Sequence, residues 1–335
     1  MIETLIKKET KENLLLTPMN GKRSVKIFSG RANIPLAKEI CDYLGLPLGK
    51  INISPFSDGE LYVQIEESVR GCDVFLIQPT CPPVNENVME LLIILDALKR
   101  ASAEKVNVVM PYFGYGRQDR KAAGREPITS KLIADLLCRA GATRVLALDL
   151  HATQIMGFFD VLVDHLFATP VLVEYIKSLG LKDIVIVSPD VGGVTRARAF
   201  AKKLDDAPIA ILDKRRPTDK HNTVEVINII GEIKNKTCIM VDDMIDTAGT
   251  ITQCAALLQK EGAKEVLACT THAVLSGPAK DRIDKSPITT LITTNSIPIP
   301  KDRSPNKLKV LSVSGLLAEA IKRIHLDDSV SEMFN

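Results

Sequence analysis

Two adjacent acids followed by a turn of small and hydroxyl-bearing residues make one stretch of this chain chemically suggestive. Asp242 and Asp243 follow a short apolar run at 238–241, and helical spacing begins at Ile251. The turn between them consists of Asp246, Thr247, Ala248, Gly249 and Thr250. Paired carboxylates can bind the hydroxyls of a sugar or hold a hydrated Mg²⁺, and backbone N–H groups at a helix start can face a phosphate. The stretch predicts a sugar-phosphate site.

The same stretch also has a purely structural interpretation. Asp246 or Thr247 could serve only as the N-cap of the helix, with the paired acids in a solvated turn. A lone Asp-x-x-Asp would favour this interpretation. The complete string favours the ligand site, because strand, paired acids, turn and helix follow one another in the order that the chemistry needs.

A second stretch concentrates positive charge after the strand-like run 106–109. It places three cations within five residues, Arg117, Arg120 and Lys121, and includes Gln118. Guanidinium and ammonium groups in such a cluster suit a polyphosphate. The alternative is a solvated basic loop.

A third stretch, at 212–222, is a basic run between two strand-like segments. It contains Lys214 and Arg216, followed by proline and polar residues that favour mobility. A cationic loop of this kind could close over a reacting phosphate.

A fourth stretch places an aromatic residue beside acids in one turn. Phe56, Asp58 and Glu60 lie between two strand-like runs. An exposed phenyl ring can stack on a base while carboxylates accept its amino hydrogens. Taken by itself, the segment is an ordinary hairpin.

The elements that must position these residues alternate between strand-like and helical patterns. This alternation predicts an α/β fold with mostly parallel sheets flanked by helices. The length of 335 residues implies two domains of roughly 150 residues each, with a boundary near 165–172. Strands are expected at 74–77, 106–109, 145–148, 184–187, 209–212, 239–241 and 266–269, and helices at 87–101, 129–139, 191–204 and 313–325.

Composition excludes several classes of protein. Apolar residues make up 45% of the chain and the net charge is +2, which argues against a nucleic-acid binder with a basic face. The seven cysteines form no C-x-x-C pair, which argues against zinc sites and disulfide frameworks and favours a reducing cytoplasm. The N-terminus lacks a signal-peptide core, and no run approaches the roughly 20 apolar residues that span a bilayer. Neither nucleic acid nor membrane is an expected partner.

The stretch around the paired acids closely resembles the phosphoribosyl diphosphate (PRPP) binding motif of the type I phosphoribosyltransferase fold. The chain from about residue 24 to 335 resembles the ribose-phosphate pyrophosphokinase (PRPP synthetase) family, of the phosphate-dependent class. The resemblance rests on six segments, at 56–60, 117–121, 149–151, 188–190, 214–216 and 241–250.

This resemblance implies two phosphoribosyltransferase-like domains and a specific reaction. The implied units are an N-terminal extension (1–23), an N-terminal domain (24–168), a C-terminal domain with the ribose 5-phosphate site (169–312), and a helix and tail that pack back on the N-terminal domain (313–335). In the implied reaction, the C1 hydroxyl of ribose 5-phosphate attacks the β-phosphorus of ATP. The products are PRPP, which feeds nucleotide and amino-acid biosynthesis, and AMP.

The resemblance also assigns residues to the nucleotide. Phe56, Asp58 and Glu60 would bind the adenine, and the resemblance implies that a neighbouring subunit contributes them. Arg117 and Gln118 would bind the ATP phosphates.

On the sugar side, the resemblance gives Asp242 and Asp243 the ribose hydroxyls, directly or through metal. The turn 246–250 would hold the 5-phosphate. Lys214 and Arg216 would stabilise the charge on the transferring group when their loop closes.

His151 and Asp190 would ligate the Mg²⁺ of ATP according to the same resemblance. Imidazole is an unusual Mg²⁺ ligand, and a histidine after a strand often serves only as a hydrogen-bonding hinge. Asp190 could be the N-cap of the helix expected at 191–204. Their occurrence together with the other segments favours the metal role for both.

The resemblance further implies a homo-oligomer, a hexamer built from dimers, with phosphate as activator and ADP as inhibitor at a shared subunit interface. Met156 stands where the family pattern usually has Gln, and a thioether cannot supply the donors of an amide. We therefore expect weakened ADP inhibition. The matching effector positions are Ser68, Arg70, Arg125, Asp164, Ser329, Ser331 and Phe334.

Two rival functions deserve comparison with PRPP synthesis. A phosphoribosyltransferase that consumes PRPP would need a nucleobase-binding hood and would leave the segments at 56–60 and 117–121 unexplained. A regulatory paralogue without activity would show losses in the basic loop or in the paired-acid stretch. The sequence retains both segments.

Overall fold

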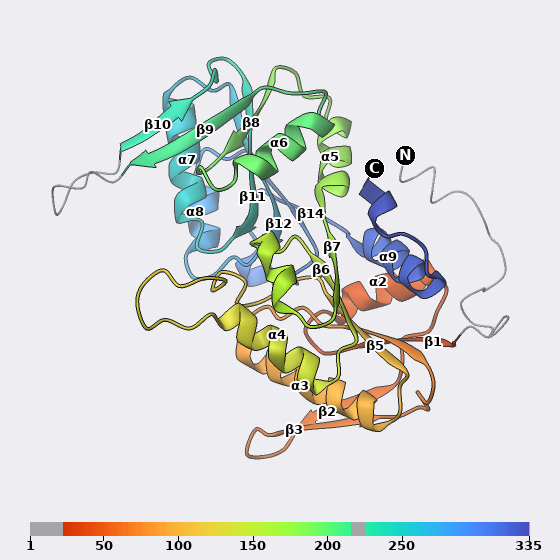
Figure 1. The fold of residues 1–335 in the computed structure, drawn as a ribbon. Coiled ribbons are helices and arrows are strands. Elements are labelled where there is room, and N and C mark those ends of the chain that lie inside the picture. The colour runs from red at the N-terminus through yellow and green to blue at the C-terminus, as the bar shows by residue number, and fades with distance from the viewer. Residues whose placement is uncertain (1–22, 216–225, 335) are drawn as a thin grey trace.

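Two sheets, one in each half of the chain, form the framework of the computed structural model, which describes residues 23–215 and 226–334 (Figure 1). The first half of the chain lies below the second half in Figure 1. Helices cover both faces of each sheet. The predicted α/β class, with mostly parallel sheets flanked by helices, is confirmed.

The sheet of the first half has five parallel strands in the order β1-β4-β5-β6-β7. Helices α3 (Val84–Arg100) and α4 (Thr129–Ala140) pack on one face, and α2 (Ile34–Leu44) packs on the other. Because both faces are covered, the strands are apolar at nearly every position and not at alternate ones. The strands are β1 (Val25–Ser29), β4 (Asp73–Ile77), β5 (Lys105–Met110), β6 (Arg144–Leu148) and β7 (Leu162–Leu166).

The sheet of the second half has seven strands in the order β10-β9-β8-β11-β12-β13-β14, and only the β10–β9 pair is antiparallel among these described strands. Helices α5 (Thr169–Ser178) and α6 (Val194–Lys203) cover one face, and α7 (Gly249–Lys260) and α8 (Ala279–Lys285) cover the other. The strands are β8 (Ile184–Ser188), β9 (Ile209–Arg215), β10 (Val226–Ile230), β11 (Thr237–Ile245), β12 (Glu265–Ala273), β13 (Thr290–Thr294) and β14 (Leu308–Leu311).

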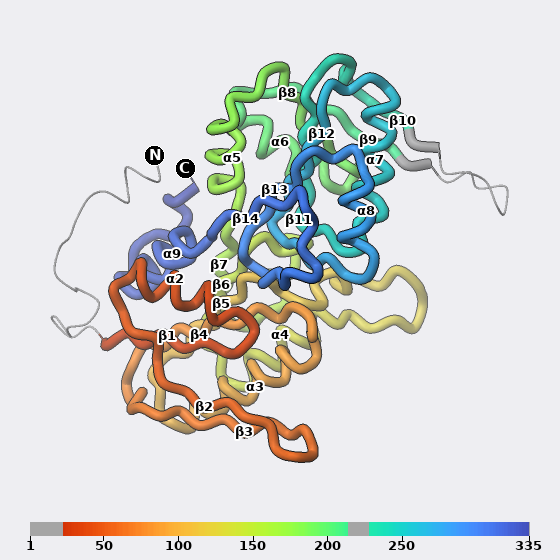
Figure 2. Tube along the Cα trace, turned by 180° about the vertical axis from the view of Figure 1, so that it is seen from behind, coloured from red at the N-terminus to blue at the C-terminus, as the bar shows by residue number. Residues whose placement is uncertain are grey.

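The last helix, α9 (Ser314–Leu326), follows the second sheet but packs against α2 of the first half (Figure 2). Near its end, Nδ1 of the buried His325 lies 2.9 Å from the carboxylate of Asp73 at the start of β4. This contact ties the end of the chain to the first sheet. Three short 3₁₀ helices complete the described structure, η1 (Thr153–Phe158), η2 (Lys301–Arg303) and η3 (Ser331–Phe334).

A two-stranded hairpin stands apart from both sheets. Strands β2 (Ile51–Pro55) and β3 (Leu61–Ile65) pair antiparallel, and β3 packs on α3. Gly59 has a φ of 95° in the connecting turn, which a side chain would disfavour. The hairpin forms the lower edge of the molecule in both Figure 1 and Figure 2.

Two helices begin at other residues than the sequence pattern suggested. Helix α3 begins at Val84, three residues before the expected 87, directly after a proline that occupies the N-cap position. Helix α6 begins at Val194, three residues after the expected 191, because a local turn held by Asp190 precedes it. None of the helices within 23–215 and 226–334 has the length and apolar character needed to cross a bilayer.

Candidate active site

Strand β11 carries both paired acids within the sheet. The strand does not end at 241 but continues to Ile245, and its side chains therefore alternate between the two faces through Asp242 and Asp243. The side chain of Asp243 is only 4% exposed, whereas that of Asp242 is 28% exposed. One carboxylate is enclosed by protein, and its neighbour reaches solvent at the carboxyl end of the sheet.

Arg196 lies between the two acids, although the sequence analysis did not single it out. Its Nη1 atom, from the first turn of α6, is 3.1 Å from Oδ1 of Asp242 and 3.2 Å from Oδ1 of Asp243. Burial, together with the adjacent charge of Asp243, raises the pKa of Asp242. Burial alone would also raise the pKa of Asp243, but hydrogen bonding to His151 and the charge of Arg196 outweigh it and hold that pKa below its usual range. Asp243 is therefore the firmly ionised member of the pair.

His151 brings the first half of the chain to this pair. It follows β6, and its Nδ1 lies 2.7 Å from Oδ2 of Asp243. The hydrogen bond with Asp243 raises the pKa of His151 above its ordinary value, against the opposing effect of burial. The ring contacts the acid that the sequence analysis assigned to the sugar, and it joins the two halves at the ends of β6 and β11.

The turn after β11 leads into helix α7, as predicted. Ala248 adopts a left-handed conformation, with a φ of 60°, and the helix begins at Gly249. Arg282 of α8 donates a hydrogen bond from Nη1 to the carbonyl of Thr247 at 3.0 Å. The turn thus combines the N-terminus of a 12-residue helix with a nearby guanidinium group, and both favour an anion.

Arg117 connects the basic loop of the first half to this turn. Its Nη1 lies 2.8 Å from Oδ2 of Asp246. Hydrogen bonds from Ser276 and Arg117 lower the pKa of Asp246 and outweigh its partial burial. Gln118 lies beside Arg117 and accepts a hydrogen bond from the Thr129 hydroxyl at 2.5 Å. The loop assigned to a polyphosphate therefore contacts the turn assigned to the sugar phosphate.

The donors at the end of β11 fit a metal ion that arrives with a substrate. Within the described residues, no group of three His, Cys, Asp or Glu side chains is arranged to hold a metal. Mg²⁺ retains several waters and needs only one or two carboxylates when substrate phosphates supply further oxygens. Asp242 and Asp243 offer such carboxylates.

Asp190 has a local structural contact. Its Oδ1 accepts a hydrogen bond from the backbone N–H of Gly193 at 2.8 Å, and its carbonyl accepts one from the Ser188 hydroxyl. Asp190 thus holds the turn that precedes α6, close to the capping alternative, although the N-cap residue itself is Gly193. The contact of His151 is with Asp243 and not with Asp190.

The adenine-assigned residues lie at the tip of the β2–β3 hairpin, away from β11 and α7 in both views (Figures 1 and 2). Phe56 is 54% exposed and contacts Tyr62 edge-to-face, with 5.9 Å between the ring centroids. Oδ1 of Asp58 accepts a hydrogen bond from the N–H of Glu60. A single chain does not bring Phe56, Asp58 and Glu60 to the site at β11.

The basic run after β9 is described only in part. Lys214 belongs to β9, where its backbone pairs with Ile227 of β10, and its side chain is not among the described parts. Arg216 lies outside the described residues.

The effector positions fall into separate regions of one chain. Ser68 and Arg70 are exposed just before β4, and Asp164 of β7 forms an ion pair with Arg144. The basic loop with Arg125 lies on the opposite side of the molecule from the C-terminal tail in both views (Figures 1 and 2).

The tail itself brings one effector position, Phe334, close to the end of β7. The hydroxyls of Ser329 and Ser331 are 2.9 Å apart, and the ring of Phe334 contacts Phe167, just after β7, at 5.8 Å between centroids. Met156 is 38% exposed on η1.

Sequence reasoning missed Arg196 and Arg282, although a weak signal exists for both. Each lies in a helix that follows the carboxyl end of a strand of the second sheet, at the edge where Asp242 and the turn lie. Only the fold shows which of many such cations faces the acids.

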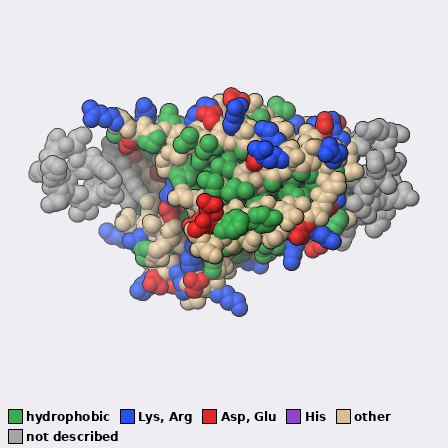
Figure 3. All heavy atoms as spheres, turned by 90° about the horizontal axis from the view of Figure 1, so that it is seen from below, with side chains coloured by type: hydrophobic (Ala, Val, Ile, Leu, Met, Phe, Trp, Pro, Cys, Tyr) green, Lys and Arg blue, Asp and Glu red, His purple; other side chains and the backbone are tan. Residues whose placement is uncertain are grey.

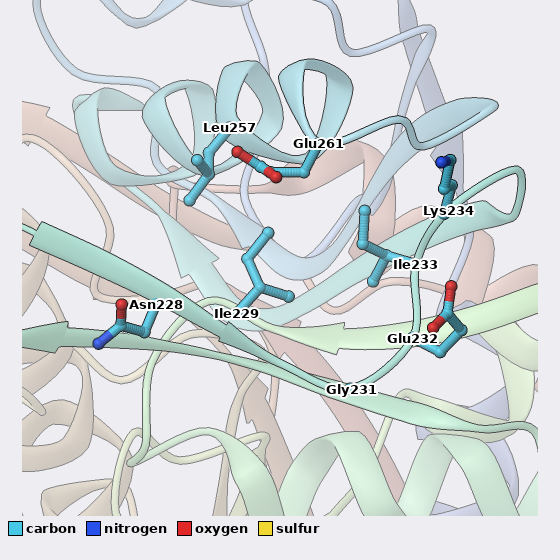
Figure 4. Close-up of a pocket in the computed structure, with 8 residues that line it drawn as sticks. All are labelled: Asn228, Ile229, Gly231, Glu232, Ile233, Lys234, Leu257 and Glu261. Carbon is cyan, nitrogen blue, oxygen red and sulfur yellow. The ribbon is translucent and has the colours of Figure 1, made fainter.

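A cavity of about 400 Å³ lies elsewhere, between β10 and α7 (Figure 4). Leu257 and Glu261 come from the helix and face Ile229 and Ile233. It contains none of the residues assigned to substrate, and the contacts at the ends of β6 and β11 define the candidate site instead.

Comparisons with known proteins identify the family of this chain. A family model described as the N-terminal domain of ribose phosphate pyrophosphokinase matches residues 25–141, and a phosphoribosyl synthetase-associated domain matches 205–335. A ribose-phosphate pyrophosphokinase of Gloeobacter violaceus is 59% identical over 314 residues, which cover 94% of each protein. A relative from Spinacia oleracea, ribose-phosphate pyrophosphokinase 1, is 59% identical over 92% of each.

A solved structure extends the similarity to the fold. Phosphoribosylpyrophosphate synthetase from Mycobacterium smegmatis superposes with a TM-score of 0.86 at 42% identity, covering 90% of this chain and 99% of that one. Sequence identity over nearly the whole length and similarity of the fold both show that this chain is a member of the ribose-phosphate pyrophosphokinase family.

Proposed function

We propose that this chain transfers the diphosphate group of ATP to the C1 hydroxyl of ribose 5-phosphate, which yields PRPP and AMP. Membership of the family supports the reaction. The observation that carries the assignment of the site is the meeting of two halves: His151 contacts Asp243 at 2.7 Å, and Arg117 contacts Asp246 at 2.8 Å. Residues suited to a polyphosphate therefore adjoin residues suited to a sugar phosphate.

On the sugar side, the turn 246–250 would bind the 5-phosphate through the N-terminus of α7, with Arg282 nearby. Asp242, the more exposed acid, would accept hydrogen bonds from the ribose hydroxyls. Asp243 is enclosed by His151 and Arg196, which fix its orientation. The sugar would thus lie over the end of β11 with its C1 hydroxyl toward the first half.

On the nucleotide side, Arg117 and Gln118 would bind the phosphates of ATP. Mg²⁺, when bound, neutralises phosphate charge and orients the phosphate oxygens. Its protein ligands would come from Asp242 and Asp243, with His151 and Asp190 as the ligands that the family pattern implies. Transfer of this kind depends on positioning and charge stabilisation more than on covalent catalysis.

Lys214 and Arg216 would stabilise the transferring diphosphate. The run that contains them continues from β9, next to β8, and β8 in turn pairs with β11. The carboxyl end of β9 lies at the same edge of the sheet as the end of β11, because β9, β8 and β11 run parallel. The contribution of Lys214 and Arg216 would be electrostatic and would be largest in the transition state.

The position of Phe56 supports a site shared between subunits. Because the hairpin tip lies away from β11 in its own chain, adenine would be bound by Phe56, Asp58 and Glu60 of a neighbouring copy. Apolar side chains gather on the lower face of the molecule (Figure 3), and the exposed ones on α3 and α4 include Met89 and Leu132, each 54% exposed. Such a patch is typical of an association surface, and we propose a homo-oligomer, a hexamer built from dimers.

A mixing experiment tests the shared site. Asp58→Ala and Asp242→Asn each remove a residue of a different half-site, so each homo-oligomer should be nearly inactive. Mixed oligomers contain some sites with both residues intact, and they should regain a measurable part of the original activity. No recovery in verified mixed oligomers would contradict the shared site. Each inactive variant taken through the mixing procedure alone gives the background, and the control Asp42→Ala, an exposed acid on α2, should stay active by itself.

Regulation and location follow as finer proposals. The positions Ser68, Arg70, Arg125, Asp164, Ser329, Ser331 and Phe334 would bind phosphate or ADP between subunits, since one chain leaves them in separate regions. We also propose a division into domains at residues 168 and 169, and a reducing compartment such as the cytoplasm, which would keep the seven cysteines as free thiols.

One assay tests the reaction. The protein is incubated with ATP, ribose 5-phosphate and Mg²⁺, and AMP and PRPP are quantified. Equal amounts of both products are expected, with neither formed when ribose 5-phosphate is omitted. Consumption of PRPP with a nucleobase and no AMP release from ATP would indicate a phosphoribosyltransferase instead. Absence of both reactions would indicate a protein without catalytic activity.

A further inference from the structure

A buried imidazole ring forms hydrogen bonds between the two halves of the chain, beside the candidate site. His272 lies on β12, is 1% exposed, and has its Nε2 3.1 Å from the carbonyl oxygens of both Leu148 and Asp149. Carbonyl oxygens only accept hydrogen bonds, so Nε2 must carry the hydrogen and donate. On the other side of the ring, Nδ1 lies 2.9 Å from the hydroxyl of Ser296. Burial lowers the pKa of His272, and the one hydroxyl hydrogen of Ser296 has two acceptors in reach, Nδ1 of the neutral ring and the carbonyl oxygen of Thr271 at 3.0 Å.

Asp149, whose carbonyl oxygen accepts a hydrogen bond from His272, has a strained backbone. Asp149 has a φ of 39°, in the left-handed region that side chains disfavour. Such a backbone persists only where its surroundings determine it. Within its own half, Asp149 donates its N–H to the carbonyl of Leu166 and accepts from the N–H of Ala168, both at 2.9 Å. These contacts fix it relative to β7.

The second half fixes Asp149 from the opposite side. Thr271, the neighbour of His272 on β12, donates its hydroxyl to Oδ2 of Asp149 at 2.7 Å. The ring of Tyr112 packs edge-to-face on His272, with 5.0 Å between centroids. The strained residue is thus held by a buried carbonyl contact and a buried carboxylate contact, both from β12.

The consequence reaches the site through two short connections. Asp149 precedes His151 by two residues, and His151 contacts Asp243. On the other side, β12 pairs directly with β11, with His272 opposite Met244, next to Asp243. The hydrogen bonds from Thr271 and His272 to Asp149 therefore determine where the segment after β6 meets the end of β11.

We propose that His272 and Thr271 are positioning residues for the diphosphate transfer: by holding Asp149 they set the His151 segment of one half against the sugar strand of the other. This inference rests on the proposed function. Among the described residues, no hydrogen bond joins the side chain of His272 or Thr271 to the groups assigned to ATP or ribose 5-phosphate, and both side chains are buried. Their loss should misplace the two substrates relative to each other, and each substrate should still bind.

The experiment compares three variants with the original protein in the full assembly. His272→Leu keeps volume and removes the donor, Thr271→Val keeps shape and removes the hydroxyl, and His272→Gln keeps an amide donor near the position of Nε2. The matched control is Glu39→Gln, on α2, which alters an exposed contact between the halves with Asn295. We measure kcat, the Kd of ATP and of ribose 5-phosphate separately, and thermal unfolding.

A displacement of about 1 Å can lower a rate roughly 100-fold, and we expect kcat of His272→Leu to fall by about 10-fold to 100-fold, with each Kd within about threefold. Thr271→Val should show the same pattern more weakly, His272→Gln should recover much of kcat, and Glu39→Gln should match the original protein.

Several outcomes would overturn the inference. An unchanged kcat in folded Thr271→Val would do so even if His272→Leu failed to fold. A loss of activity that disappears at saturating substrate, with kcat unchanged and only the Kd of one substrate raised, would reduce His272 to a structural role. Inactivity of the original protein toward ATP and ribose 5-phosphate would instead refute the proposed function, so the two failures are distinguishable.

Discussion

The ends of β5 and β11 offer opposite chemistry on similar frameworks. Each strand lies inside a parallel sheet and is followed, after a connection, by a helix on the face of that sheet. Two acids lie near the end of β11 and a short turn follows them, and Asp243 is 4% exposed with both carboxylate oxygens paired. After β5 comes a longer loop of cations, in which the side chain of Arg117 is 55% exposed. The acids proposed for the sugar are built into the sheet, whereas the cations proposed for the polyphosphate are carried by an exposed loop.

This difference predicts which residues should affect substrate binding and which should affect the rate of the reaction. Groups that are enclosed and paired before a ligand arrives act by pre-organisation, and their loss disturbs both binding and stability. Exposed cations on loops contribute little to the stability of the free protein. They act when charge develops on a substrate.

The largest effect is expected from Lys214 and Arg216, the proposed catalytic cations. Lys214→Ala or Arg216→Ala should lower kcat about 10²-fold to 10³-fold, as loss of a transition-state donor does, and leave each KM within a few-fold. Steady-state kinetics measure both. Lys260→Ala, an exposed cation at the end of α7, serves as control. Near-original turnover in both catalytic variants would remove these residues from the mechanism.

The next effect sharpens the contrast between the two acids. Asp243→Asn removes the ionised partner of His151 and Arg196, and loss of one partner of a buried charged contact costs about 3–5 kcal/mol. We expect the lower end, because Asp242 remains beside Arg196. Asp242→Asn should weaken ribose 5-phosphate binding with a smaller loss of stability, since its side chain is 28% exposed. Chemical denaturation and calorimetric titration would show the difference, and equal stability losses would contradict it.

A smaller effect concerns pH at the contact between the halves. Asp243 raises the pKa of His151, so folding favours the protonated ring, and this contribution is fully present below the unfolded pKa of about 6.5. It is lost as the pH rises through the higher folded value. Because the ring is 39% exposed, the contribution should stay below about 1 kcal/mol.

The comparison of His151→Gln with the original protein isolates this contribution. The difference in the free energy of unfolding between the two proteins should be largest near pH 6, which is below the unperturbed histidine pKa of about 6.5. It should shrink toward pH 9. A difference that stays constant across this interval would mean that the charge on His151 does not stabilise the interface.

The smallest effect is expected at Met156, which is 38% exposed on η1. Met156→Gln restores an amide where the family pattern usually has one, and one added hydrogen bond of about 1 kcal/mol corresponds to roughly fivefold tighter inhibition by ADP. An ADP dose response for both proteins checks this. Equal inhibition constants would dismiss any role for the thioether.

Local patterns predicted the fold and part of the site. The apolar runs, the paired acids and the turn into α7 were readable because each depends on residues near one another in sequence. The extension of β11 through Asp242 and Asp243 was not readable, since acids at a strand end can equally begin a turn. Their pairing with β12 decides it.

Contacts between distant residues could not be predicted in the same way. Arg196 lies 46 residues from Asp242, and His151 lies 92 residues from Asp243. His272 looks like an ordinary core position on a buried strand, and only the approach of the other half shows what its ring holds. Asp190 was ambiguous from the start, and its contact with Gly193 is the local one.

The course of β11 through the paired acids has one more consequence, for the length of the chain. Because side chains along a strand alternate with a period of two, inserting one residue between Val241 and Asp242, or deleting Val241, would exchange the faces of the two carboxylates. The enclosed acid would then point toward solvent, and the open one toward His151. Replacement of a side chain does not change the face on which each carboxylate lies. The segment should therefore be far less tolerant of insertions than of substitutions.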